Sequence, residues 1–285
     1  MITSVNLGSN GRLGNQLFQY AALRGLSLKN GYQIKIPNPN TMSWHGQKCL
    51  LNKFCITEDY LKDSDLQKII HNYVEPDWKK IDNKFFELPD NTNINGYFQS
   101  MFYFEEFADQ IRKELTPKSE FLKIEKDYIE KLKLEHKCEI VSVHVRRGDN
   151  MSNNQIGLIK AFEPEGIYQE YFQKAKEIFS NKKVKFLVFT GGKRGDEDNT
   201  EDLEWCKKFF SGDEFIFSEN KDQIGDFCRI MCCDHNILSQ ASSFGWWASY
   251  LNTNETKITV APEWYHPDEP SLKREKFYPK NFILK

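Results

Sequence analysis

The chain has 285 residues, enough for two domains of ordinary size. Its 39 basic and 41 acidic residues give a net charge of −2, which excludes the basic field typical of proteins that bind nucleic acids or anionic membranes. Aromatic residues make up 14% of the chain, so the composition is that of a globular protein and not of a disordered one.

The sequence also indicates the compartment. No apolar stretch approaches the roughly 18 residues that a membrane span needs, and the first residues have no signal-peptide pattern. Seven cysteines, an odd number, favour reduced thiols over a disulfide framework. We therefore expect a cytoplasmic protein with at most peripheral membrane association. Cys228, Cys232, Cys233 and His235 match no standard zinc spacing, and we expect them in the hydrophobic core.

The amino-terminal segment has the pattern of a short strand, a glycine-rich loop and a helix. Residues 15–30 carry apolar side chains at helical spacing, and Gly31 supplies a stop. The glycines of residues 8–14 do not fit the dinucleotide fingerprint, and there is no Walker lysine pattern. Asn15 and Gln16 place amide donors and acceptors at the start of the helix, so this loop is a candidate ligand contact.

The next part of the chain carries weaker signals. Residues 44–90 indicate short helices and long loops, and residues 92–97 a strand. Residues 102–115 have an amphipathic helical pattern that ends before Pro117. A charged helix is predicted at residues 119–135.

After this charged helix the pattern changes to a regular alternation of strands and helices. The predicted strands are residues 139–143, 184–189, 214–217, 236–238 and 257–261, and the predicted helices are residues 168–181, 201–210, 222–233 and 244–251. Such alternation implies right-handed crossovers and a parallel sheet. We therefore place the domain boundary where the alternation begins, which gives domains 1–136 and 137–285, the second of them Rossmann-like.

The hexapeptide His144-Val145-Arg146-Arg147-Gly148-Asp149 follows the first strand of this alternation. It brings two guanidinium groups, an imidazole and a carboxylate to the carboxyl end of the strand, where ligands bind in open α/β sheets. Paired arginines suit a phosphate or diphosphate, because a planar guanidinium offers two donors to two oxygens at once. The alternative is a surface salt-bridge cluster.

A second candidate anion site follows the strand at residues 236–238. The segment SQASSFGWW, residues 239–247, opens a helix, and Ser242 and Ser243 place hydroxyls beside the free N–H groups of its amino terminus. Ordinary N-capping is the alternative. Two such sites at strand ends of one sheet favour a diphosphate held between them.

Two Asp-x-Asp triplets, residues 63–65 and 196–198, are of the kind that binds divalent ions in some enzymes. Both lie in polar sequence, and we expect them at the solvated surface. We expect neither a metal nor another cofactor, with Arg146 in the electrostatic role of a metal.

Three segments together resemble a known family. GRLGNQLFQYA at residues 11–21, HVRRGD at 144–149 and SSFGWWASYL at 242–251 resemble, in this order and at these separations, the bacterial α-1,2-fucosyltransferases of glycosyltransferase family 11. GYFQS at residues 96–100 and VAPEWY at 260–265 extend the resemblance to nearly the whole chain. It implies a GT-B-like α/β fold of two Rossmann-like lobes with a cleft between them, and a parallel sheet in the C-terminal donor lobe.

The resemblance also implies an activity. It is that of an inverting, metal-independent galactoside α-1,2-fucosyltransferase of O-antigen or other glycan biosynthesis, with domain 1–136 on the acceptor side and domain 137–285 binding the donor. Such an enzyme moves L-fucose from GDP-β-L-fucose to the 2-hydroxyl of a terminal β-galactoside, so the implied partners are GDP-fucose and a galactose-terminated oligosaccharide. The alternatives are a fucosyltransferase with a protein or chitin-type glycan as acceptor, and a GDP-binding regulatory protein without catalysis.

The resemblance assigns roles to individual residues. Arg146 contacts the β-phosphate of GDP, and His144 lies near the nucleoside. The resemblance does not assign the general base; Asp149 is our candidate because it lies near the donor loop, and Glu163 and Glu165 in the following segment are the alternatives. The residues expected to bind the donor are Asn15, Gln16, His144, Arg147, Ser242, Ser243 and Phe244. For Arg147 and Asp149, the alternative is to support the loop through an internal ion pair.

Two departures from the family pattern bear on the site. The family commonly has Ser-Asp-Asp where this chain has Thr190-Gly191-Gly192, so the acidic residue suited to the guanine amino edge is missing. The acidic candidates to replace it are Asp196, Glu197, Asp198 and Asp202, and the backbone is the other possibility. Gly245 and Ala248 stand where Ser and Gly are usual, and we expect them only to adjust local packing.

Overall fold

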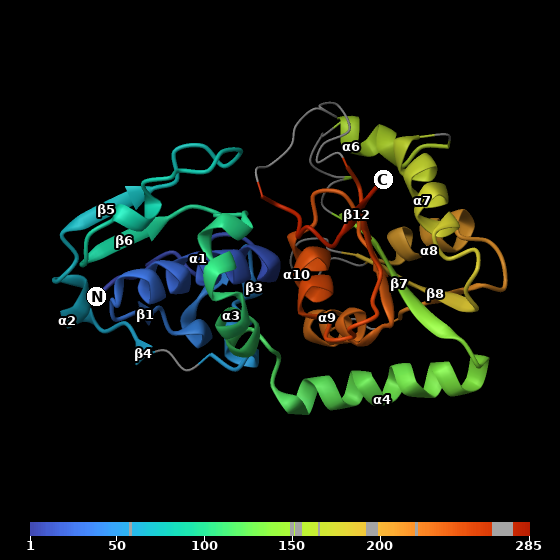
Figure 1. The fold of residues 1–285 in the computed structure, drawn as a ribbon, viewed down its shortest axis with the longest axis horizontal. Helices are drawn as coiled ribbons and strands as arrows, with labels where there is room; N and C mark the ends of the chain where they lie inside the picture. Colours follow the sequence, from blue (N-terminus) through green and yellow to red (C-terminus); the bar gives the residue numbers. More distant parts are fainter. Residues whose placement is uncertain are drawn as a thin grey trace. The chain divides into compact units, whose positions relative to one another are not determined.

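The computed structural model of the chain describes residues 1–56, 59–148, 151, 156–164, 166–191, 199–219, 222–263 and 276–285, with the backbone alone at 156–158. The chain divides into two compact units (Figure 1). Unit 1 comprises residues 1–118 and 274–279, and unit 2 comprises residues 119–273 and 280–285. The division lies before the charged helix, whereas the sequence placed the domain boundary after it. That helix packs against unit 2.

Unit 2 is built on a six-stranded parallel sheet. Its strands are β7 (Glu139–Val145), β8 (Val184–Thr190), β9 (Phe215–Phe217), β10 (His235–Ile237), β11 (Thr259–Ala261) and β12 (Ile283–Leu284). Their order across the sheet is β12-β11-β10-β7-β8-β9, and every pairing is parallel. This is the 3-2-1-4-5-6 order of doubly wound dinucleotide-binding folds. The α/β class and the parallel sheet of the C-terminal half are therefore confirmed.

Helices cover both faces of this sheet (Figure 1). They are α4 (Ser119–His136), α6 (Ile156–Ala161), α7 (Ile167–Glu177), α8 (Thr200–Phe209), α9 (Gln223–Cys232) and α10 (Ser243–Leu251). Val141, Val143 and Val145 of β7 belong to the core that α7 and α8 complete on one face. Because side chains alternate along a strand, His144 projects to the opposite face, where Phe244 and Gly245 of α10 contact it.

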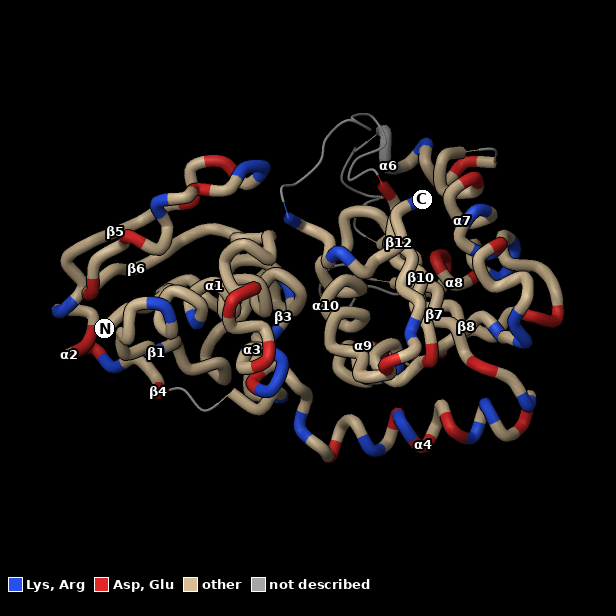
Figure 2. The backbone as a smooth tube through the Cα atoms, viewed as in Figure 1, with Lys and Arg blue, Asp and Glu red and all other residues tan. Residues whose placement is uncertain are grey.

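Helix α4 follows its predicted bounds closely. Its buried positions, Glu125, Ile129 and Leu132, lie on the side that packs against α9, and Arg229 of α9 donates to Glu125 Oε2 at 2.6 Å. Lysines and acidic residues alternate along the rest of the helix (Figure 2). The buried stripe explains why this charged helix belongs to unit 2.

Unit 1 contains shorter elements. Its helices and 3-10 turns are α1 (Leu13–Asn30), η1 (Pro39–Thr41), η2 (Leu51–Lys53), α2 (Asp63–Leu66), η3 (Phe85–Glu87), η4 (Met101–Tyr103), η5 (Glu105–Phe107) and α3 (Ala108–Glu114). Its strands are β1 (Lys35–Ile36), β2 (Ser43–Trp44), β3 (Gln47–Lys48), β4 (Asp59–Tyr60), β5 (His71–Val74) and β6 (Thr92–Asn95). The residues Ile2 and Thr3 form parallel bridges to Ile34 and Asn93 and so connect the β4-β1 pair with the β6-β5 pair. Unit 1 thus also has a small parallel layer, with α1 following its central segment.

Helix α1 is the core of unit 1. It is buried on nearly all sides, and it ends at Gly31, which adopts φ 69° and donates its N–H to the Ser27 carbonyl, as the predicted glycine stop requires. Gly25 lies against the backbone of η4, where a Cβ atom would come within 2.0 Å of the Tyr103 carbonyl oxygen. A glycine is needed at this contact because no side chain fits between the helix and η4.

The helix predicted at residues 102–115 is broken into η4, η5 and α3. Phe104 has φ −150° and ψ −1°, which interrupts the helical backbone between the two 3-10 turns. Phe104 and Tyr103 are both fully buried. No glycine or proline marks the break, so only the packing of these rings determines it.

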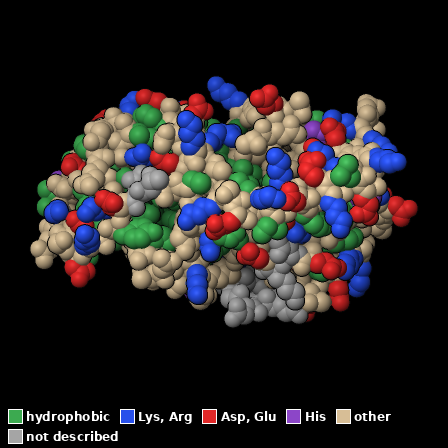
Figure 3. Space-filling model, turned by 90° about the horizontal axis from the view of Figure 1, so that it is seen from below, with side chains coloured by type: hydrophobic (Ala, Val, Ile, Leu, Met, Phe, Trp, Pro, Cys, Tyr) green, Lys and Arg blue, Asp and Glu red, His purple; other side chains and the backbone are tan. Residues whose placement is uncertain are grey.

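The cysteine group of α9 and β10 lies in the interior, as predicted. Cys228, Cys233 and His235 are buried, and burial raises the pKa of Cys232 to about 11. No described helix combines the length and apolar character needed to cross a membrane. On the face shown in Figure 3, basic and acidic side chains are interspersed, in keeping with the small net charge.

Candidate active site

The centre of the unit 2 sheet positions the candidate site. Strands β7 and β10 are neighbours, and the chain leaves them toward opposite sides of the sheet, which makes their carboxyl ends a topological switch point. The arginine loop, residues 146–148, follows β7, and the serine loop, residues 238–242, follows β10. The two candidate anion sites predicted from the sequence therefore lie side by side.

A hydrogen-bonded chain joins the two loops. The Arg146 N–H donates to Ser239 Oγ at 3.0 Å, and Ser239 donates to Gln240 Oε1 at 2.8 Å. Ser239 and Gln240 are fully buried, whereas Arg146 is half-buried. Because Ser239 holds the Arg146 backbone in place, the Arg146 side chain starts from a fixed position at the sheet edge.

His144 lies at the end of β7 with only 8% of its surface exposed. Its ring centre is 5.7 Å from that of Phe244, and a Cβ atom at Gly245 would come within 2.8 Å of its Nδ1. Gly245 thus leaves room for the imidazole, a more direct role than the local packing adjustment expected. Nδ1 has no hydrogen-bond partner among the described residues. Burial lowers the pKa of His144 to about 4, so the imidazole is neutral at physiological pH.

Arg147 forms an internal ion pair. Its Nε is 3.2 Å from Asp202 Oδ1 of α8, and the Gly148 N–H donates to the other carboxylate oxygen at 3.1 Å. The guanidinium lies 4.3 Å from the ring centre of Trp205, and the Arg147 side chain is 12% exposed. Of the two alternatives for Arg147, this geometry matches support of the loop. The ion pair also occupies Asp202, one of the acidic residues considered as a replacement for the missing guanine contact.

The amino terminus of α10 faces the same edge. Ser242 is the N-cap, and its Oγ accepts the Gly245 N–H at 3.2 Å. The Ser242 hydroxyl therefore caps the helix, which was the alternative to an anion contact. Ser243 and Phe244 are partly exposed. The partial positive charge of this helix end favours an anion beside these two residues.

In unit 1, Asn15 and Gln16 differ in their surroundings. Gln16 is 1% exposed, donates to the Gly11 carbonyl at 3.1 Å and accepts the Leu50 N–H at 3.3 Å. Asn15 is half-buried, and Gln99 Nε2 donates to its Oδ1 at 2.6 Å. Gln16 therefore holds the glycine-rich loop in shape, and Asn15 is the more exposed of the two amides.

Several predicted residues lie outside the described residues. They are Asp149, Gly192, Asp196, Glu197 and Asp198. Thr190 and Gly191 are described, and Thr190 Oγ1 donates to the Val145 carbonyl at 3.3 Å, which ties the end of β8 to β7.

Asp226 is a residue that the sequence reasoning missed. It lies in the first turn of α9, and Ser218, directly after β9, donates to its Oδ1 at 2.9 Å. It therefore sits at the ligand-binding edge of the sheet. Burial raises its pKa to about 7. An acidic residue between the buried Gly225 and Phe227 at the start of an apolar helix was the available signal.

In the triplet at residues 63–65, Asp63 and Ser64 are exposed as expected, but Asp65 is buried, contrary to our expectation. Asp65 is 2% exposed and pairs with Lys35 at 2.8 Å and Lys68 at 3.0 Å. These ammonium groups hold the pKa of Asp65 well below its usual range. Within the described ranges, no group of three or more His, Cys, Asp or Glu side chains is arranged to hold a metal ion.

Comparison with a family model identifies the family, and known relatives and a solved structure are similar to the chain. The model of glycosyl transferase family 11 matches residues 2–284. The chain is 28% identical to the alpha-1,2-colitosyltransferase of Escherichia coli, over 91% of each protein. It is also 28% identical to the galactoside alpha-(1,2)-fucosyltransferase 2 of Sus scrofa, over 92% of this chain and 73% of that protein. The crystal structure of fucosyltransferase NodZ from Bradyrhizobium is similar at a TM-score of 0.47 and 14% identity, over 87% of this chain and 91% of that one.

Proposed function

Because the chain belongs to glycosyltransferase family 11, we propose that it transfers L-fucose from GDP-β-L-fucose to the 2-hydroxyl of a terminal β-galactoside, with inversion at the fucose carbon. The relative from Sus scrofa is named for an activity of this kind. The observation that carries the proposal is the pairing of the arginine loop with the amino terminus of α10 at the switch point of the unit 2 sheet.

In this proposal the diphosphate of the donor lies between the Arg146 guanidinium and the N–H groups at the start of α10. As the fucose–oxygen bond breaks, negative charge grows on the β-phosphate of departing GDP. A fixed cation and fixed dipoles stabilise that charge without reorganisation. Arg146 is the catalytic cation, Ser243 and Phe244 line the donor pocket, and neutral His144 lies toward the nucleoside side of the ligand.

The remaining predicted donor contacts divide by their geometry. We assign Arg147, Gln16 and the Ser242 hydroxyl to positioning, because each is engaged in a hydrogen bond or ion pair inside the protein. Asn15 keeps its proposed role toward the fucose or its phosphate.

Asp226 is our candidate for the guanine contact that the missing acidic pair leaves open. A carboxylate accepts two N–H groups from the guanine edge, and Asp226 lies beyond the end of β9, where Ser218 donates to its Oδ1. Asp202 is less suited because Arg147 and Gly148 already occupy it. Since the pKa of Asp226 is about 7, GDP affinity should fall as the pH is lowered below 7 and the carboxylate becomes protonated.

Replacing Arg146 tests the proposed site. Arg146→Ala removes a charge-assisted contact to the leaving group and should lower kcat with GDP-fucose by about 100-fold or more, on the order of 3 kcal/mol. The matched control is Lys182→Ala, which removes an exposed cation at the amino ends of the strands, where Lys182 pairs with Glu139. Unchanged turnover in Arg146→Ala would remove the donor site from this edge.

The base and the metal independence have separate tests. Asp149 remains our proposed base, and Asp149→Asn should lower turnover strongly while GDP affinity is retained. A loss of GDP affinity alone would show that Asp149 supports the arginine loop.

We also propose transfer without a metal. Loss of activity with a chelator, restored by Mg²⁺ or Mn²⁺, would contradict that.

A second candidate donor is GDP-linked colitose, because the relative from Escherichia coli is an α-1,2-colitosyltransferase. Colitose lacks the 3-hydroxyl of fucose, so competition between the two GDP-sugars for one galactoside measures whether the site recognises that hydroxyl. A higher kcat/KM for GDP-colitose would assign the chain to colitose transfer.

A further inference from the structure

Unit 1 has a hollow that the proposed donor site does not use. It offers about 180 Å³ of space and lies between the segment after β5 and the turn after β6. Glu75, Trp78, Lys79, Lys80, Gln99 and Ser100 are among the residues that line it. This space includes room that is open to solvent, and the enclosed part holds about one water molecule, so a sugar ring would lie against the open face of the hollow and not inside a cavity.

The wall formed by residues 96–100 is held in an unusual backbone shape. Glu75 Oε2 accepts the N–H groups of Tyr97 at 2.8 Å and Phe98 at 3.1 Å. Phe98 has φ 49°, a conformation that costs energy in a non-glycine residue. A Cβ atom at Gly96 would come within 2.5 Å of Glu75 Cβ, so the close approach needs a glycine. Backbone strain that the surrounding contacts maintain is typical of ligand sites.

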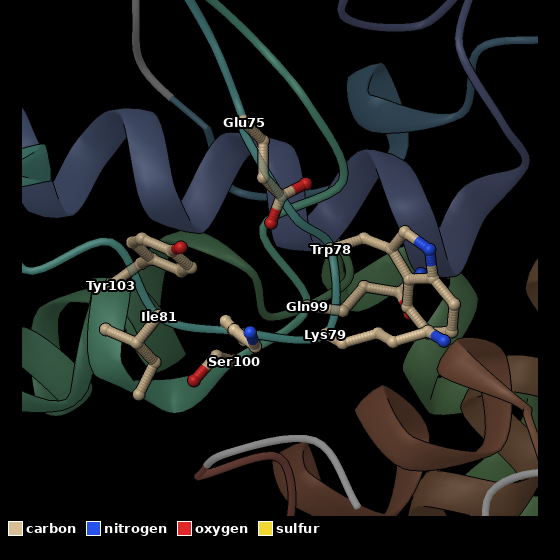
Figure 4. A pocket seen from close by; sticks show the side chains of 8 residues that line it. Glu75, Trp78, Lys79, Ile81, Gln99, Ser100 and Tyr103 are labelled. Carbon is tan, nitrogen blue, oxygen red and sulfur yellow. The ribbon is translucent and has the colours of Figure 1, made fainter. Parts of the chain in front are cut away.

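Trp78 gives the hollow an exposed aromatic surface. It is 38% exposed, and Figure 4 shows its indole together with the side chains of Gln99 and Lys79. An indole packs against the C–H face of a pyranose, while amide and ammonium groups hydrogen-bond to its hydroxyls. Gln99 is 9% exposed and also reaches Asn15, so the hollow adjoins the start of α1 within unit 1.

The charges around the hollow favour a neutral ligand. Among the lining residues, Lys79 and Lys80 supply two cations and Glu75 one carboxylate, and the neighbouring Asp77 accepts the backbone N–H of Lys79 at 2.9 Å. This balance differs from the arginine-rich edge of unit 2, and it fits hydroxyl recognition better than phosphate recognition.

From these observations we propose that the hollow is an acceptor subsite, in which a neutral pyranose ring of the glycan stacks on Trp78 and hydrogen-bonds to Gln99. This inference rests on the proposed function, because it assumes a glycan acceptor. It assigns acceptor recognition to specific side chains of unit 1.

Direct binding tests the subsite without requiring turnover. Lactose, N-acetyllactosamine and galactosyl-N-acetylgalactosamine are titrated separately, in the presence of GDP, into the full chain and into Trp78→Ala, with saturation-transfer NMR giving the Kd. We expect Trp78→Ala to bind the preferred disaccharide about tenfold more weakly or worse, and Trp78→Phe, which keeps a smaller ring, to lose less.

The matched control is Tyr60→Ala, which removes another exposed aromatic of unit 1, 43% exposed and outside the residues lining the hollow. It should bind the disaccharide as the unsubstituted chain does. Circular dichroism reports whether each variant is folded, and GDP affinity measured by calorimetry reports whether unit 2 is intact. Equal disaccharide affinity in Trp78→Ala and Tyr60→Ala, or no binding of any of the three disaccharides to the unsubstituted chain, would overturn the subsite.

The two proposals fail in different ways. If fucose is transferred but Trp78→Ala leaves the Kd and KM for the acceptor unchanged, the subsite is wrong and the function stands. If the disaccharide binds through Trp78 but no sugar is transferred from GDP-fucose, the subsite stands and the donor or the reaction has to be revised.

Discussion

Replacing Asp202 by alanine removes the support of the arginine loop. The Asp202 side chain is 4% exposed, and its two oxygens hold Arg147 Nε at 3.2 Å and the Gly148 N–H at 3.1 Å. Alanine leaves a buried guanidinium and a buried N–H group without these acceptors. Arg147 remains over Trp205, but ring contact does not replace a carboxylate.

The cost follows from burial. Removing one partner of a buried ion pair typically destabilises by about 3–5 kcal/mol, because the remaining charge stays in a poorly solvated place. For a unit of this size, each kcal/mol shifts Tm by about 2–4 °C, so Asp202→Ala should lower the unfolding midpoint of unit 2 by about 10 °C. Asp202→Asn keeps the shape and part of the hydrogen bonding, and its loss should be smaller.

Thermal unfolding followed by tryptophan fluorescence measures this, because Trp205 lies on the affected guanidinium. The control is Glu170→Ala, which breaks an ion pair with Lys174 whose side chains are 66% and 54% exposed, and which should cost less than about 1 kcal/mol. GDP affinity should also fall in Asp202→Ala as the loop loosens. A midpoint change no larger than that of the control would refute the view that this ion pair holds the loop.

Three further predictions concern packing and pH. A glycine-to-alanine substitution stabilises an ordinary helix by about 1 kcal/mol. Gly25→Ala should instead lower the unfolding midpoint, because the new Cβ would lie 2.0 Å from the Tyr103 carbonyl oxygen. A raised midpoint would contradict the close packing of α1 against η4. The pKa of His144 is lowered to about 4, so its contribution to stability is complete above about pH 6.5 and is lost as the pH falls toward 4. Urea unfolding at pH 7 and pH 5 measures this. Between these pH values, the free energy of unfolding should fall less in His144→Gln than in the unsubstituted chain, and an equal fall would contradict the burial of a neutral His144. The pKa of Asp226 is raised to about 7, so its contribution is present below about pH 4 and is lost as the pH rises toward 7. Asp226→Asn should therefore raise the unfolding midpoint at pH 7 more than at pH 4 and weaken GDP binding, and unchanged GDP affinity would dismiss the guanine contact.

The sequence predicted unit 2 far better than unit 1, and the reason is physical. β7 and β8 are seven-residue strands made mostly of apolar residues, and α4 and α9 carry clear helical patterns, so each element is marked by its own side chains. In unit 1, strands such as β1 and β4 have only two residues, too few for a period to appear.

The candidate site shows the same limit. Strand ends could be read from the sequence, so the neighbouring positions of Arg146 and Ser242 followed from the parallel sheet. The partners of Arg147 and the location of Asp226 depend on how α8 and α9 pack, which no local pattern records. Asp65 appeared to be a surface residue for the same reason, since Lys35 comes from a strand 30 residues earlier.

The most direct test of the central claim is incubation of the chain with GDP-fucose and each of lactose, N-acetyllactosamine and galactosyl-N-acetylgalactosamine, followed by NMR of the product. We predict an α-linked fucose on the 2-hydroxyl of the terminal galactose. Transfer to another position, or no transfer to any of the three acceptors, would contradict the proposed function.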